Sequence, residues 1–350
     1  MRKVLLLIGL ITILATGCNR MMLRTRVNMD GPIDTRVTDI TPVSPIAGPV
    51  KPVVVQNGNA GRVAVLDVDG LLLNTPFVGP ISLGENPVAL FREKLDAIEN
   101  DYCVKAVVIR INSHGGGVAA CQAMRRDLEK FKARSGKPVV ACLMDIATGG
   151  AYYIASAADQ IVAGESTVTG AIGVILNLFN LQDLMAQFNI IPQSIKSGEK
   201  IDIGTSAKAL KVEDRQILQA MSDEFNSQIL ADIRKARPNL GGGETTTDGR
   251  IFTATQAKDR GLIDQVGDMD AAITMAISMA YPNAAPTAKP QVVLYRRNND
   301  PANSVYAVSP NIPIQGAGLF PNLPGLERSK LPTFLSVWQP ELTMEKLGGK

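Results

Sequence analysis

The sequence predicts an α/β protein with a parallel sheet and helical cover. Apolar runs rich in β-branched residues, such as "RVAVLDVDG" and "VKAVVIRIN", have the length and composition of buried strands. Each of these runs is followed by a longer stretch with helical periodicity, and strands that alternate with helices favour a parallel sheet. A content of 45% hydrophobic and 20% charged residues over 350 positions is typical of a globular chain with a sizeable core.

The elements are expected in the following order. The first strand ends at an Asp-Gly turn signal, so we interpret the Asp67-x-Asp69-Gly sequence as a turn rather than a metal site. The helical stretches place apolar residues three and four positions apart between charged ones. Strands are expected over residues 62–70, 104–112 and 137–145, and helices over residues 86–100, 119–136, 151–159, 176–189, 211–236 and 253–261.

The N-terminus has the pattern of a secretory signal. Arg2 and Lys3 precede the apolar run "VLLLIGLITI", which is shorter than the roughly 20 residues that span a bilayer. The following "LATGC" resembles a bacterial lipoprotein signal, which would make Cys18 the lipidated N-terminus of the mature protein. The alternative is a plain signal peptide with a chance cysteine. Either pattern predicts an exported, periplasmic or extracytoplasmic body, and the first adds a lipid anchor to a membrane of the cell envelope.

Composition divides the chain into segments. The extension that follows the body contains a strand-like "QVVLYRR" and a terminal "LPTFLSVWQPEL", and it is expected to be peripheral and packed in part. The tether that precedes the body is expected to be flexible or extended, with the alternative that a few of its residues add an edge strand. The boundaries are residues 1–17 for the signal peptide, 18–60 for the tether, 61–282 for the body and 283–350 for the Pro/Asn-rich extension.

Charge and cysteine content exclude two classes of function. Scattered basic residues, 36 Lys and Arg against 33 Asp and Glu, leave a net charge of +3 and no patch for nucleic acid. Cys103, Cys121 and Cys142 lie in apolar surroundings without a CxxC pair, and the chain has a single histidine. We therefore interpret these cysteines as small buried hydrophobic residues, and we expect no metal and no cofactor.

The glycine run Gly115, Gly116 and Gly117 follows a predicted strand and precedes a predicted helix. Exposed backbone N–H groups at such a turn can bind an anion, either a phosphate or the oxyanion of acyl transfer. A phosphate loop needs Lys and Ser or Thr directly after the glycines, whereas Val118 follows here. A plain flexible turn remains the alternative.

Several motifs in register resemble one family. They are "INSHGGGV", "AYYIASAADQIVA", "STVTGAIGVI", "IKSGEKIDIG" and "DGRIFTATQAKDRGLIDQVG", within residues 62–280. The chain is similar to the short form of signal peptide peptidase A, a serine peptidase family of the bacterial envelope that uses a Ser/Lys dyad. The resemblance implies a crotonase/Clp-protease-like fold, proteolysis, and assembly into homo-oligomers.

The chain departs from this family at both dyad positions. Counting along the motifs places Gly149 at the nucleophile position and Ile201 at the base position, so both side-chain functions are absent. A slip by one residue at each site would rebuild a dyad from Thr148 and Lys200. Without a slip, Lys200 would point away from the side to which Ile201 points, because neighbours in an extended segment face opposite ways.

These departures lead to three hypotheses about function. The first is a pseudopeptidase lipoprotein that binds an extended peptide or a partner without cutting it. The second is an active peptidase that degrades signal-peptide remnants with the slipped dyad. The third is an oligomeric structural scaffold.

Overall fold

The computed structural model describes residues 49–75, 85–282, 289–297, 305 and 334–337. All of them belong to one compact unit. The predicted signal peptide, Cys18 and most of the tether lie outside the described residues. Among the described residues, no helix has the length and apolarity needed to span a membrane.

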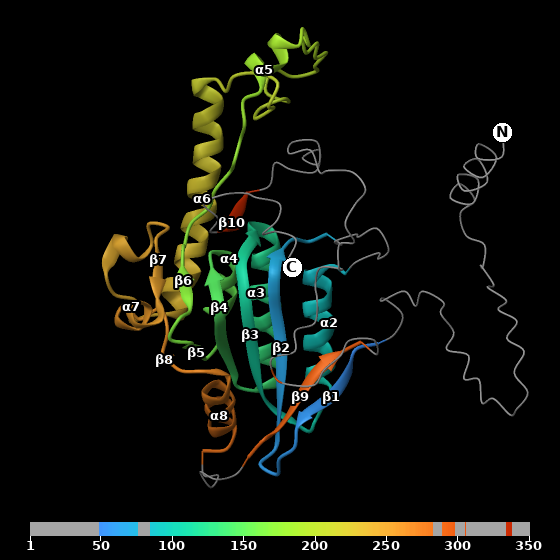
Figure 1. Ribbon diagram of the computed structural model, residues 1–350, viewed down its shortest axis with the longest axis vertical. Coiled ribbons are helices and arrows are strands. Elements are labelled where there is room, and N and C mark those ends of the chain that lie inside the picture. Colours follow the sequence, from blue (N-terminus) through green and yellow to red (C-terminus); the bar gives the residue numbers. More distant parts are fainter. Residues whose placement is uncertain (1–48, 76–84, 283–288, 298–304, 306–333, 338–350) are drawn as a thin grey trace, which may run out of the picture. The chain divides into compact units, whose positions relative to one another are not determined.

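The core of the fold is a mixed sheet with the strand order β1-β9-β2-β3-β4-β5-β8 (Figure 1). The pairs that join β2, β3, β4, β5 and β8 are parallel, and β9 pairs parallel with β2 but antiparallel with β1. Short strands extend the sheet where β6 pairs with β4 and β7 and where β10 pairs with β3. The strands are β1 (Lys51–Gln56), β2 (Arg62–Leu72), β3 (Val104–Gly117), β4 (Val139–Thr148), β5 (Gln160–Ala163), β6 (Val168–Gly170), β7 (Ile251–Thr253), β8 (Gln265–Val266), β9 (Gln291–Arg296) and β10 (Leu335–Val337).

Alternate residues of the central strands face opposite sides of the sheet, as the period of two requires. In β2, Val63 and Val65 pack against helix α8 (Met269–Ala280), whereas Ala64 and Leu66 belong to the larger core on the other face. In the sequence, the buried strands of a parallel sheet therefore appear as continuous runs of apolar residues.

The helices are α2 (Pro87–Glu99), α3 (Val118–Ser135), α4 (Gly150–Ala155), α5 (Gln182–Gln187), α6 (Val212–Ala236), α7 (Ala254–Asp259) and α8 (Met269–Ala280), with a 3₁₀ turn over Gly243–Thr246.

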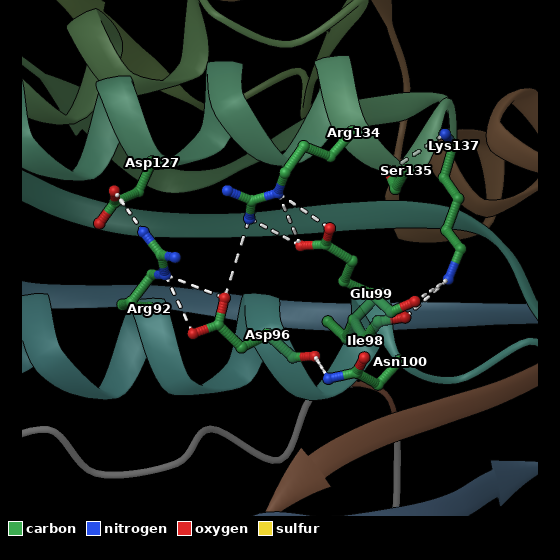
Figure 2. Close-up of polar contacts among 9 residues, drawn as sticks. All are labelled: Arg92, Asp96, Ile98, Glu99, Asn100, Asp127, Arg134, Ser135 and Lys137. Atoms are coloured by element: carbon green, nitrogen blue, oxygen red, sulfur yellow. Dashed lines mark hydrogen bonds and ion pairs between the residues drawn. The ribbon is translucent and has the colours of Figure 1, made fainter.

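Helices α2 and α3 lie side by side and are joined by charged side chains (Figure 2). Arg92 of α2 bonds Asp127 of α3 at 2.9 Å, and Arg134 of α3 bonds Glu99 of α2 at 2.7 Å. Lys137 donates to the carbonyl oxygens of Ile98 at 2.6 Å and Asp101 at 2.9 Å. Both carbonyl oxygens also accept backbone N–H groups, so the ammonium adds a charged donor to them, and its charge interacts favourably with the dipole of α2.

Helix α6 extends from the body, and α5 with its flanking loops lies near the N-terminal end of α6 (Figure 1). Ile229 and Ile233, in the C-terminal half of α6, are buried in the main core. The loops around α5 carry many exposed apolar side chains. We call residues 176–211 the arm; its exposed large apolar residues are Phe179, Leu181, Leu184, Phe188, Ile190, Ile191, Ile195 and Ile201.

The α/β class and the strands over residues 62–70, 104–112 and 137–145 are confirmed, and so is the long helix over 211–236. The extension is not peripheral, because β9 lies inside the sheet between β1 and β2. Part of the tether adds β1 as an edge strand. The expected helix over 176–189 is reduced to α5, because its apolar residues find no core to pack against and are exposed. Cys103 is also exposed, whereas Cys121 and Cys142 are buried as expected.

Candidate active site

Gly149 forms the turn between β4 and α4. Its φ of 54° and ψ of −121° lie in a region that favours glycine, and its carbonyl oxygen accepts the N–H of Tyr153 at 3.0 Å, in the first turn of α4. Its own N–H donates to Gly170 at 2.9 Å, which ties the turn to β6. A sharp strand-to-helix turn of this kind presents whatever side chain it carries at the end of the sheet. Here it carries none.

Gly115, Gly116 and Gly117 lie beside this turn, at the end of the neighbouring strand. They are not a free turn with exposed N–H groups, as the sequence suggested, but the last, buried residues of β3. Gly116 pairs with Leu72 of β2 on one side and with Ser336 of β10 on the other. The glycines therefore pair with β2 along one edge of the strand and with β10 along the other. Their second edge is occupied by another segment of the chain.

The segment that joins this edge comes from the C-terminal extension. We call residues 334–337 the strap. It runs antiparallel to Gly115–Gly117, and the Val118 N–H donates to the carbonyl oxygen of Phe334 at 3.0 Å. On its other side, Leu335 exchanges two backbone hydrogen bonds with Ile175, at 2.8 and 3.0 Å, and the Ser336 hydroxyl donates to Gly173 at 2.9 Å. We call the position between Gly115–Gly117 and Gly173–Ile175 the acceptor site.

The carbonyl of Ser336 lies against several glycines. A Cβ on Gly149 would lie 2.5 Å from the Ser336 oxygen, which is closer than non-bonded atoms approach. A Cβ on Gly115 would also collide with this oxygen, and Gly115 has a φ of 103° that favours glycine in any case. A Cβ on Gly150 would lie 3.2 Å from the same oxygen. A peptide carbonyl therefore fits into the acceptor site because residues 115, 149 and 150 are glycines without side chains.

Thr148 and Lys200, the two residues of the alternative dyad, form hydrogen bonds in two different parts of the fold. The Thr148 side chain is fully buried, and its hydroxyl donates to the carbonyl oxygen of His114 at 3.2 Å. The Lys200 ammonium bonds Asp214 at 2.7 Å and Glu213 at 3.0 Å, at the N-terminal end of α6. Both residues belong to described parts of the chain, and the structure does not bring them together.

The position of Asp214 on α6 shows how far Lys200 lies from the acceptor site. Ser222 of α6 contacts Val174, which adjoins the acceptor site, through a 3.3 Å hydrogen bond. Asp214 is eight residues, about 12 Å, further along the helix from Ser222. Figure 1 shows the loops around α5 beyond that end of α6.

The surroundings of residues 200 and 201 also differ from the expected extended segment. They begin a series of turns, and the side chain of Ile201 is 69% exposed rather than directed into a pocket. The hydrogen bonds from Lys200 to Asp214 and Glu213 raise the pKa of its ammonium group. A general base needs the opposite shift, since it must be deprotonated near neutral pH.

Sequence reasoning missed the strap. Its only signal was the apolar alternation in "FLSVW", which stands in a Pro/Asn-rich extension and is too short to identify a strand. Nothing in the sequence assigned it a partner strand.

Comparisons with known proteins support the family resemblance that the sequence motifs indicate. The model of peptidase family S49 matches residues 131–280, which include Gly149 and Ile201. The chain is 31% identical over 224 residues to Protease 4 of Salmonella typhi and 31% identical over 225 residues to the chloroplastic serine protease SPPA of Arabidopsis thaliana; each match covers 63% of this chain. It is 28% identical over 207 residues, 59% of its length, to a putative signal peptide peptidase SppA of Enterococcus faecium.

These matches span about a third of the Salmonella and Arabidopsis proteins, 35% and 32%, and 60% of the Enterococcus protein. Among solved structures, a variant of the 1510-N membrane-bound stomatin-specific protease gives a TM-score of 0.41 at 15% identity, over 67% of this chain and 97% of that chain. The shared motifs, the family model and the sequence similarity to the Salmonella, Arabidopsis and Enterococcus proteins agree with one another. Residues 131–280 therefore match peptidase family S49, and the chain resembles the signal peptide peptidase A family.

Proposed function

We propose that this protein is a pseudopeptidase of the cell envelope that binds extended peptide segments without hydrolysing them. The observation that carries the proposal is the acceptor site, where the edge of β3 takes up an antiparallel strand beside a turn that has glycine in place of a nucleophile. Backbone pairing of this kind supplies affinity for an extended peptide with little demand on its sequence.

The absence of hydrolysis follows from the chemistry of a Ser/Lys mechanism. Such a mechanism needs a hydroxyl to attack the carbonyl and a deprotonated lysine to take its proton. Gly149 has no hydroxyl, and Ile201 has neither a basic group nor a place beside the acceptor site. The slipped dyad is disfavoured because Thr148 is buried and bonded to His114, and because two carboxylates hold Lys200 in its protonated form.

Peptide binding without cleavage is the first test. A fluorescein-labelled, unstructured apolar peptide should bind the purified full-length protein in a polarisation assay and be recovered intact by mass spectrometry. Measured in a Ser336→Glu background, in which residues 334–337 no longer fit the site, Ile175→Pro should weaken this binding, since it removes the N–H that donates to Leu335 and, by the same pairing, to a bound peptide. Ile195→Pro is the matched control, because Ile195 lies in an exposed loop of the arm. Equal binding by both variants would refute the acceptor site as the place of binding.

Hydrolysis is the second test. The native protein should leave the peptide uncut and should not react with a serine-directed fluorophosphonate probe. If hydrolysis is found and is abolished by Thr148→Ala or by Lys200→Ala, the protein is an active peptidase with the slipped dyad, and the pseudopeptidase proposal is wrong.

We also propose that the arm assembles with a second copy of the chain. Exposed apolar side chains gathered on one segment are typical of a protein interface. Light scattering should give a mass above that of one chain, 37.3 kDa before any processing, and Phe188→Asp should lower it. Assembly without any peptide binding would favour the scaffold hypothesis. A lipid on Cys18 would hold this assembly at a membrane.

A further inference from the structure

The strap occupies the acceptor site in the position of a substrate. A Cβ on residue 149 would lie 2.5 Å from the oxygen of Ser336, 2.7 Å from its carbonyl carbon and 3.0 Å from the nitrogen of Val337. These three atoms form one peptide group. The Ser336–Val337 peptide bond therefore lies directly over the point from which a nucleophile at position 149 would emerge.

The backbone pairing of the strap is also that of a bound substrate. A peptidase holds an extended peptide by its edges and brings the carbonyl to be attacked within about 3–3.5 Å of the nucleophile. The strap pairs with Gly115–Gly117 on one edge and with Ile175 on the other, and only its carbonyl at Ser336 faces Gly149. The difference from a substrate is that the strap belongs to the same chain.

Side chains add to the hold on the strap. The ring of Phe334 packs edge-to-face on Phe225 of α6, with centroids 5.0 Å apart. The side chain of Ser336 is buried, with 1% exposure, and its hydroxyl bonds Gly173. A tethered segment of this kind competes with free peptide at an effective concentration on the order of millimolar.

We infer that residues 334–337 are an intramolecular pseudosubstrate, which closes the acceptor site to other peptides until the strap leaves. The inference rests on the proposed peptide-binding function and adds its regulation. Gly149 suits this role because it leaves room for the Ser336 carbonyl and offers no hydroxyl to attack it. The native protein then binds free peptide only in the small fraction of molecules whose strap is released.

The test is a full-length variant in which the strap no longer fits. In Ser336→Glu, a carboxylate would have to be buried against the carbonyl oxygen of Gly173, so the strap should leave the acceptor site. Ser227→Glu, on an exposed position of α6, is the matched control. Phe334→Ala is a milder second variant, which loses the contact with Phe225, and Tyr102→Ala, at an exposed position outside the arm, is its control.

Two measurements are made on each protein. The first is the affinity for a labelled peptide with the sequence "KLPTFLSVWQPEL", residues 330–342, which carries the unaltered strap. The second is hydrogen exchange of the strap and of strands β2 to β4. We expect Ser336→Glu to bind the peptide at least about tenfold more tightly than the native protein, which is the gain on removing an internal competitor at about 1 mM when the strap sequence binds with a Kd of about 0.1 mM or below. Its strap should lose protection from exchange, as should the residues at the end of β3 that pair with it, while the rest of β2 to β4 keeps its protection, and both controls should behave as native.

Other outcomes separate this inference from the function on which it rests. Equal peptide affinity in the native protein and in Ser336→Glu would leave peptide binding standing and overturn the pseudosubstrate. A native strap that exchanges as fast as the free peptide would overturn it as well. If Ser336→Glu releases the strap and still binds no peptide, the acceptor site does not take peptides from outside, and both the proposed function and the pseudosubstrate are wrong.

Discussion

Gly149→Ala tests whether the strap depends on the glycine that the motifs predict to stand at the nucleophile position. The variant adds a single methyl group, which has two separate effects. It strains the backbone, because φ at residue 149 is 54°, and it places a carbon 2.5 Å from the Ser336 oxygen. Only the second effect requires the strap, so the two can be separated by repeating the substitution in the Ser336→Glu background.

The size of each effect follows from the contacts. Backbone strain at such a position costs about 1–3 kcal/mol and is the same in both backgrounds. Displacement of the strap removes the backbone hydrogen bonds to Val118 and Ile175, each worth about 0.5–1.5 kcal/mol net, and is offset in part by the regained freedom of the strap. We expect a coupling free energy of at least about 1 kcal/mol between Gly149→Ala and Ser336→Glu, because the strap is lost only once.

Urea denaturation of the four proteins, followed by circular dichroism, measures this coupling. Gly136→Ala is the matched control for strain, since Gly136 has a φ of 64° and a Cβ there would meet nothing within 4 Å. Gly136→Ala should lower the free energy of unfolding equally with and without Ser336→Glu. If Gly149→Ala also costs the same in both backgrounds, to within about 0.3 kcal/mol, the strap does not depend on the glycine and the reasoning fails.

Three further predictions concern other parts of the chain. If Cys18 is acylated, Cys18→Ser should move the protein from the detergent phase to the aqueous phase, and a native protein that already partitions into water would contradict the anchor. Burial, with the neighbouring Asp67 charge, raises the pKa of Asp69 to about 6 from 3.8, so the folded state binds the extra proton and stability falls as the pH rises through this range. Asp69→Asn should therefore stabilise the protein by about 1–3 kcal/mol at pH 7.5 and by much less at pH 4, and equal effects at the two pH values would refute the shift. Lys137→Met should cost about 1–2 kcal/mol in urea denaturation, because it removes the charged hydrogen bonds from the Lys137 ammonium to carbonyl oxygens at and just after the end of α2 (Figure 2), whereas Lys130→Met at an exposed position should cost little.

Elements with a strong local pattern could be predicted from the sequence. The strands β2, β3 and β4 are buried on both faces, so their apolar runs are visible without knowledge of their partners. The turn at Gly149 was identified because the motifs around it fix its register. The prediction that Cys103 is buried was wrong. Apolar neighbours in the sequence do not determine whether a residue in the loop between α2 and β3 is buried.

Features that depend on distant pairing could not be predicted. Ser336 bonds Gly173, which lies 163 positions earlier, and no periodicity encodes such a partner. The same limit applies to Lys200, whose carboxylate partners are decided by how the loop folds onto α6 rather than by the spacing of its motif. The counting that placed Ile201 at the base position is a prediction of register along the motif, and such a register does not locate the side chain in space.

A serine at position 149 and a strap over it conflict for two physical reasons. Sterically, any side chain at residue 149 meets the Ser336–Val337 peptide group, so the strap would have to shift outward. Chemically, an activated hydroxyl beside that carbonyl would attack it, and a resident strap would be consumed as a substrate. Glycine removes both conflicts with one substitution. A site that keeps its pairing edges but carries glycine at this turn can therefore hold the strap without cutting it, so that the proposed pseudosubstrate is intact after each release and can return to the acceptor site.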